Sequence, residues 1–135
     1  MSRNLGISQN KVPRAGAIIM FKVIVAGGRD FNDYSLLEKT LDKLLQHKTE
    51  VQIVSGLARG ADSLGVVYAL DKNIPVAKFP ANWEAHGTMA GYQRNIEMAE
   101  YADACVCFWN GKSRGTKHMI RIARNLNLQI RIIKY

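Results

Sequence analysis

Glycines mixed with arginine, aspartate and hydroxyl residues follow apolar runs at three places in this chain. The first is Gly27–Asp30, the second is Ser55–Asp62 and the third is Asn110–Thr116. Glycine lets a backbone approach a ligand closely, and the free N–H groups where a helix begins bind anions. Each stretch is therefore a candidate ligand loop. The alternative is a strand-to-helix connection whose glycines serve geometry alone.

The second stretch carries a fixed positive charge. Ser55 and Gly56 end an apolar, β-branched run, and Arg59 follows before a helical pattern that opens with Asp62. The guanidinium fork of arginine suits phosphate or carboxylate. Taken alone, this turn is the first candidate for an anion site.

The third stretch has the composition of a phosphate cradle. Gly111 and Gly115 leave the backbone accessible, while Ser113 and Thr116 add hydroxyl groups. The GK[ST] ending of a Walker loop is absent. The alternative, which the spacing leaves open, is that Ser113 or Thr116 only caps the following helix.

Two further clusters carry polar chemistry. Arg94-Asn95 lies in a helical pattern, where the arginine either reaches into a crevice with Asn95 as its partner or faces solvent. Asn82–Gly87 is a polar and aromatic connection, in which Trp83 can stack on a base or cover a sheet edge. His86 has no neighbours at metal-ligand spacing, so we expect no metal site.

Acid–base chemistry has few candidates. Near the loops they are Asp30, Asp62, Glu84 and His118, and nothing in the sequence pairs them. The catalytic residues, if the protein has any, stay unidentified. Glu84 and His118 are the weak candidates.

The elements that position these residues alternate regularly. Strands are predicted over 21–26, 51–55, 75–79, 104–109 and 128–133. A Ser35/Glu38 capping box predicts a first helix from about Leu36 to residues 47–48. Further helices are predicted over 61–72, from a Thr88 cap to about residue 101, and over 115–127. Residues 81–88 are expected to be irregular. The alternation predicts an α/β, Rossmann-like doubly wound parallel sheet of order 3-2-1-4-5 with helices on both faces. In that order the three glycine loops meet at one crevice.

Composition limits the class of protein. We expect residues 1–19 to be a flexible leader and residues 20–135 to form a single domain. No apolar run reaches membrane-spanning length, so a cytoplasmic location and no membrane contact are expected. Cys105 and Cys107 are expected to be small buried hydrophobes rather than redox or metal groups. The net charge is +8, and residues 111–135 hold seven basic residues and no acidic one. These basic residues either attract phosphate or form a solvated face without a partner.

Several motifs together resemble a known superfamily. These are Ala26–Phe31, Ser55–Asp62, Phe79–Trp83 with His86-Gly87, Arg94-Asn95, and Gly111-x-Ser113-x-Gly115-Thr116. They resemble the SLOG superfamily, named for the SMF/DprA and LOG proteins, and look closest to its YspA-related branch of bacterial and phage proteins. The resemblance covers about residues 21–135.

The resemblance implies a Rossmann-like domain that binds a nucleotide or a nucleotide-derived phosphate ligand, as a sensor or regulatory module with no required cofactor. It also implies a homodimer or a higher homo-oligomer. The expected ligand-binding residues are Gly27, Gly28, Arg29, Asp30, Ser55, Gly56, Arg59, Asp62, Arg94, Asn95, Gly111, Ser113, Gly115 and Thr116. Among them the phosphate is expected at Gly111–Thr116, with Arg94 neutralising its charge.

Two alternatives follow from other members. LOG enzymes hydrolyse the N-glycosidic bond of a nucleoside monophosphate and carry a catalytic glutamate three residues after the threonine of their glycine turn. Here that position is Met119, which cannot act as acid or base, so hydrolysis is disfavoured. DprA-like binding of single-stranded DNA is the second alternative. The basic C-terminal region favours it, and the small number of aromatic residues opposes it.

Overall fold

The computed structural model describes residues 19–135, so all but the last position of the predicted leader lies outside the described residues. In this part the strands are β1 (Phe21–Gly27), β2 (Val51–Ser55), β3 (Val76–Lys78), β4 (Ala104–Trp109) and β5 (Gln129–Lys134). The helices are α1 (Tyr34–Leu45), α2 (Ala61–Asp71), α3 (Trp83–His86), the 3-10 turn η1 (Gly87–Met89), α4 (Ala90–Tyr101) and α5 (Arg114–Asn125). None of these helices is long and apolar enough to cross a membrane.

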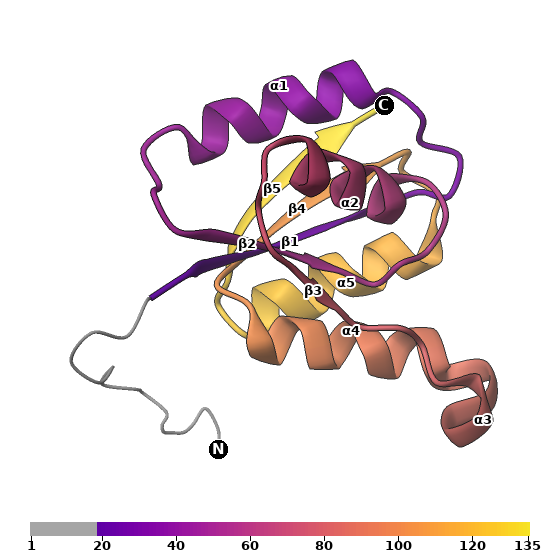
Figure 1. The fold of residues 1–135 in the computed structure, drawn as a ribbon. Helices are drawn as coiled ribbons and strands as arrows, with labels where there is room; N and C mark the ends of the chain where they lie inside the picture. The colour runs from indigo at the N-terminus through magenta and orange to yellow at the C-terminus, as the bar shows by residue number, and fades with distance from the viewer. Residues whose placement is uncertain (1–18) are drawn as a thin grey trace.

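The strands form one sheet in the order β3-β2-β1-β4-β5, and each neighbouring pair is parallel. Helices α1 and α2 cover one face of this sheet and α4 and α5 cover the other, while the short α3 projects beyond the layers (Figure 1). The predicted doubly wound, Rossmann-like sheet and its strand order are confirmed. The winding reverses between β1 and β4, which is where such sheets open a ligand crevice.

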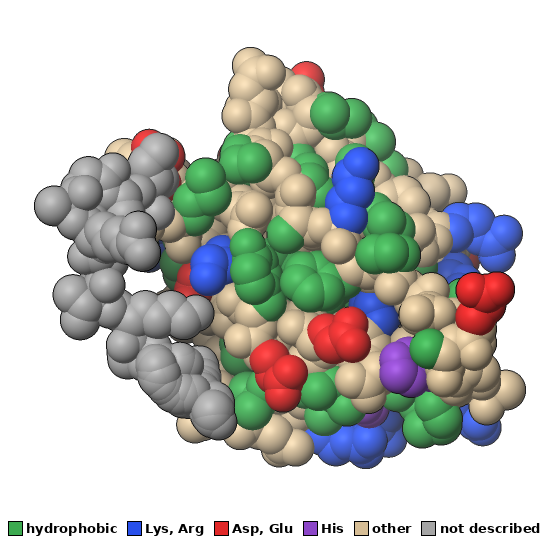
Figure 2. All heavy atoms as spheres, turned by 60° about the horizontal axis from the view of Figure 1, so that its bottom comes forward, with side chains coloured by type: hydrophobic (Ala, Val, Ile, Leu, Met, Phe, Trp, Pro, Cys, Tyr) green, Lys and Arg blue, Asp and Glu red, His purple; other side chains and the backbone are tan. Residues whose placement is uncertain are grey.

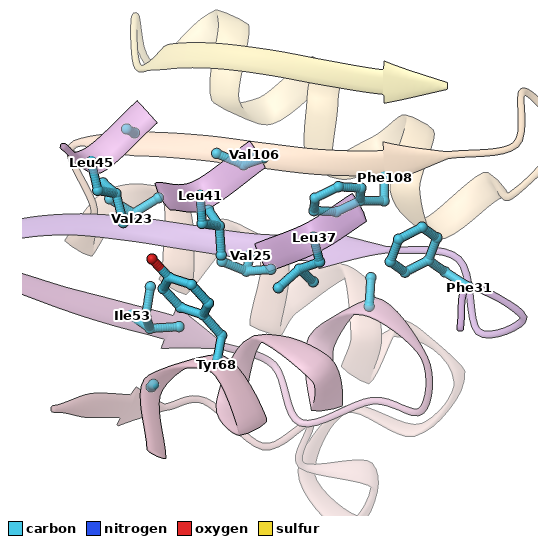
Figure 3. Packing of buried hydrophobic residues seen from close by; sticks show 13 residues of the cluster. Val23, Val25, Phe31, Leu37, Leu41, Leu45, Ile53, Tyr68, Val106 and Phe108 are labelled. Atoms are coloured by element: carbon cyan, nitrogen blue, oxygen red, sulfur yellow. The ribbon is translucent and has the colours of Figure 1, made fainter. Parts of the chain in front are cut away.

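Side chains alternate between two buried layers because successive residues of a strand point to opposite faces. On the α1/α2 face, Val23 and Val25 of β1 pack with Leu37 and Leu41 of α1 and with Phe108 (Figure 3). The leucines recur at helical spacing, so α1 lays one apolar stripe along the sheet. This packing fixes where β1 ends and hence where its glycine loop begins.

The α4/α5 face uses the alternate positions of the same strands. Ile24 of β1 and Cys105 of β4 pack against Met98 of α4 and Met119 of α5. Cys105 and Cys107 are both fully buried, with their sulfur atoms 3.4 Å apart, as expected for small hydrophobic residues on one face of a strand. Met119 anchors the first turns of α5 beneath the predicted phosphate loop.

Two predicted helix starts are wrong. Asp33, not Ser35, caps α1, since its Oδ1 accepts the backbone N–H of Leu36 at 3.0 Å. A carboxylate satisfies that amide as well as a hydroxyl does, and the earlier cap adds two residues to the helix. The segment predicted as irregular contains α3, which Asn82 caps through the amide of Ala85 at 3.0 Å, and α4 starts at Ala90 without a Thr88 cap.

Candidate functional site

A cavity of about 520 Å³ opens at the carboxyl edge of the sheet, between β1 and β4. Its volume lies in the range of small-molecule sites. All three predicted loops contribute to its lining: Gly27, Gly28, Arg29 and Asp30 after β1, Ala58 and Asp62 after β2, and Asn110, Ser113, Gly115 and Thr116 after β4. The predicted convergence of the glycine loops is therefore present in the fold.

The first two loops pack directly on each other. The carbonyl oxygen of Gly28 accepts hydrogen bonds from the amides of Phe31 and Ala61, both at 3.2 Å. Gly60, just before α2, has φ of 87°, and a Cβ there would overlap the same carbonyl oxygen. Only glycine combines this backbone conformation with so close an approach, so Gly60 sets the distance between the loops.

The β1 loop is also held from the end of β5. Tyr135 donates its hydroxyl to Asp30 Oδ1 at 2.5 Å, and its ring lies 4.9 Å from that of Phe31. Burial and this contact raise the pKa of Tyr135 to about 12, so it stays a donor at neutral pH. No motif in the sequence singles out Tyr135. The order of the sheet is the signal that locates it, because β5 follows β4 at the same edge.

The residues that end β2 hold the structure together rather than line the cavity. Ser55 is fully buried, and its Oγ donates to the carbonyl oxygen of Asp62 and accepts from the amide of Leu57, both at 3.1 Å. A Cβ on Gly56 would meet Arg94 and Asp62, so this glycine leaves room for both side chains. Arg59 is exposed and does not line the cavity.

Asp62 is a buried carboxyl in the wall of the cavity, with 4% of its surface exposed. Burial raises the pKa of Asp62 to about 6, although the Arg94 guanidinium and the amides of Ala58 and Gly27 pull it down. Burial lowers the pKa of the Arg94 guanidinium, and the nearby Asp62 carboxylate opposes that shift. Asp62 and Arg94 therefore place two opposite charges, which partly compensate each other, in the wall of the cavity.

Arg94 is fixed by two hydrogen bonds. Its Nη1 donates to the carbonyl oxygen of Gly56 at 2.5 Å, and its Nε donates to Asn95 Oδ1 at 3.1 Å. Asn95 is itself buried and donates its amide to the carbonyl oxygen of Gly115 at 3.3 Å. The structure thus joins Arg94 to the start of α5, with Asn95 as the partner that the sequence indicated.

The loop before α5 is built by short-range capping. Asn110 Oδ1 accepts the amides of Lys112 and Ser113 at 2.8 and 2.9 Å, and Ser113 Oγ accepts that of Thr116 at 3.3 Å. Ser113 therefore caps the helix and also lines the cavity. Within residues 19–135 the first-turn amides of Arg114 and Gly115 have no hydrogen-bond acceptor, which leaves them for a ligand.

Gly111, Glu84 and His118 lie outside the cavity lining, whereas the acid–base candidates Asp30 and Asp62 line it. Gly111 has φ of 85° and makes the turn. Glu84 is exposed on α3, and His118 packs against Tyr92, with ring centroids 4.5 Å apart. Met119, at the position of the LOG glutamate, does line the cavity.

The side of the cavity opposite the loops was largely missed from the sequence. It consists of Trp83 of α3, Thr88 of η1, and Gly91 and Tyr92 of α4. For Trp83, an aromatic residue on a long connection, the sequence left open whether it stacks on a base or covers a sheet edge. The rotation of α4 that brings Tyr92 to the cavity depends on packing, which the helical pattern does not specify.

Comparisons with known proteins agree with this architecture. Residues 21–86 match the model of the YspA, cpYpsA-related SLOG family. The Gene 61 protein of Mycobacterium phage D29 is 34% identical over 118 residues, which cover 82% of this chain and 94% of that protein.

Solved structures of DNA processing protein A, DprA, share the fold. The protein from Streptococcus pneumoniae gives a TM-score of 0.68 at 18% identity, covering 86% of this chain and 51% of that one. The protein from Helicobacter pylori, whose single-stranded DNA binding mode was described, gives 0.58 at 18% identity, covering 83% and 64%. This chain thus spans only part of each DprA. With a phage relative covered almost from end to end and the family model matched across the first two glycine loops, the chain belongs to the YspA, cpYpsA-related SLOG family.

Proposed function

We propose that this domain binds a nucleotide or a nucleotide-derived phosphate ligand in the cavity at the carboxyl edge of its sheet. The observation that carries the proposal is that Arg94 and the first turn of α5 line one cavity together with the glycine loop after β1. A helix start offers free amides and a positive dipole end to an anion, and arginine adds a full charge.

The arrangement is also preorganised. Arg94 is held by Gly56 and Asn95, and the α5 loop is held by Asn110, so little order has to be gained on binding. We infer a sensor or regulatory role rather than LOG-type hydrolysis. Met119 supplies no acid or base at the position of the LOG glutamate, and Glu84 and His118 lie outside the lining. Asp62 does line the cavity, but its carboxyl is engaged with Arg94 and the amide of Ala58.

Isothermal titration with AMP, ADP-ribose and cyclic nucleotides tests the proposal. We expect saturable binding by at least one of them. Arg94→Ala is expected to weaken that binding at least tenfold, because a charge-assisted contact to phosphate contributes about 1.5–3 kcal/mol. Arg121→Ala is the matched control, since Arg121 is an exposed arginine of α5 outside the cavity.

Two results would contradict the proposal. One is the absence of binding by every nucleotide. The other is equal loss of affinity in Arg94→Ala and Arg121→Ala, which would indicate attraction to the basic surface in general. Because Arg94 also makes structural hydrogen bonds, the unfolding temperature of each variant has to be measured alongside.

Binding of single-stranded DNA is the second candidate. The DprA of Helicobacter pylori is described as binding single-stranded DNA, and this chain carries a net charge of +8. Against it, Figure 2 shows Lys and Arg side chains separated by acidic and apolar ones over the α4 side of the molecule, outside the atoms drawn in grey. A groove for a strand of DNA is more typically a continuous basic track.

A further inference from the structure

The cavity has two chemically different sides. The loops after β1 and β4 present glycines, hydroxyls and Arg29, whereas the opposite side presents the rings of Trp83 and Tyr92. An anion accounts for the first side only. Aromatic rings at a polar site are suited to a planar group, which they contact face to face.

Trp83 is exposed to an unusual degree for its size. It keeps 58% of its surface exposed to solvent, and every residue from Asn82 to Met89 is exposed as well. Within residues 19–135, the side chain of Trp83 has no hydrogen bond, aromatic pair or cation–π contact. Core packing therefore does not explain a tryptophan at this place.

Trp109 offers a contrast within the same molecule. It is half-buried, its Nε1 donates to the carbonyl oxygen of Ser113 at 3.1 Å, and Lys134 lies 5.3 Å above its ring. That tryptophan supports the α5 loop. Trp83 supports nothing in the described fold, yet it lines the cavity.

Tyr92 gives the aromatic side a fixed component. Its ring packs at 4.5 Å against that of His118, whose Nδ1 lies 3.2 Å from the side-chain nitrogen of Asn95. Asn95 also contacts Arg94, so a chain of side-chain contacts joins the anchored Tyr92 ring to the guanidinium. Tyr92, Arg94 and Trp83 all line the same cavity.

We propose that Trp83 stacks on the base of the bound ligand, so that the ligand is a nucleotide with its base attached and not a sugar phosphate or inorganic phosphate. This inference rests on the proposed function. Every base has a π face, so stacking confers affinity without selecting one base. The base lies toward Trp83 and Tyr92, and the phosphate lies toward Arg94 and the start of α5.

Titration calorimetry with AMP and with ribose 5-phosphate tests the inference. The wild-type protein should bind AMP about tenfold more tightly, given what one stacked base contributes. Trp83→Ala should remove this preference and leave the ribose 5-phosphate affinity unchanged, while Trp83→Phe should keep most of it. Met89→Ala, another exposed apolar residue nearby that does not line the cavity, should change neither affinity.

Fluorescence gives a second readout, because the chain has two tryptophans and only Trp83 is proposed to touch the base. AMP, but not ribose 5-phosphate, should change the emission of the wild type, and Trp83→Phe should abolish the change. Equal wild-type affinities for the two probes would overturn the inference while leaving the proposed function intact. Binding of neither probe would overturn the inference, and it would overturn the proposed function too if ADP-ribose and the cyclic nucleotides also fail to bind.

Discussion

Asp62 is the residue whose chemistry depends most on the fold. Its carboxyl is buried beside Arg94, and its pKa is raised from the ordinary 3.8 to about 6. The ionised form is therefore less stable in the fold than in the unfolded chain. Between about pH 4 and pH 6 the native state binds more protons than the unfolded state, so this group makes the protein more stable as the pH falls.

The substitution Asp62→Asn isolates this contribution. On going from pH 7 to pH 4 the wild type is expected to gain about 2 kcal/mol of stability relative to the variant, since most of the pKa difference is expressed in this range. Urea unfolding of both proteins across this range measures it. Taking the difference cancels the other titrating groups, including His118, whose pKa burial and Arg121 lower. A difference that is flat with pH would contradict the assignment.

At the scale of elements, the helix starts separate what a pattern can tell from what it cannot. The capping-box spacing of Ser35 and Glu38 predicted a helix start at about Leu36, whereas the cap of α1 is Asp33, two residues before Ser35. In the fold Asp33 satisfies the amide of Leu36. The choice depends on how the chain leaves β1, a tertiary property that local spacing does not contain.

Alanine substitutions test the corrected cap. Asp33→Ala should lower the free energy of unfolding by about 1 kcal/mol, the usual value of an N-cap. Ser35→Ala, at an exposed position inside the first turn, should change it by less than about 0.5 kcal/mol. Thermal or urea unfolding distinguishes them. The reverse order of the two effects would restore the original prediction.

At the scale of the whole molecule, the excess of positive charge governs the competing function. If single-stranded DNA binds through the basic surface, its affinity should fall steeply with salt, since each neutralised phosphate releases a counterion. We expect instead that an oligothymidylate binds weakly. AMP should displace only the oligothymidylate that occupies the cavity. Titrations between roughly 50 and 200 mM salt decide the question. Tight DNA binding that AMP does not affect would favour the DprA-like alternative.

The sequence predicted the fold well because its signals are long and redundant. Five strands and the helices between them follow from apolar periodicity, and parallel crossovers leave few orders for the sheet. It predicted the loop side of the cavity, where glycines mark the strand ends, and the Arg94-Asn95 pair of α4. Trp83, Tyr92 and Tyr135 reach the cavity or its loops from elsewhere in the chain, and their positions follow from helix rotation and sheet closure.

The contact between Gly60 and the Gly28 carbonyl has a consequence for protein engineering and for sequence variation within the family. Two segments more than thirty positions apart act as one module, so neither glycine loop can be transplanted into another Rossmann-like domain without the other. Among relatives that retain the cavity, a side chain at the position of Gly60 should occur only together with a remodelled first loop. Aligned sequences of the family would reveal this as covariation between the two motifs.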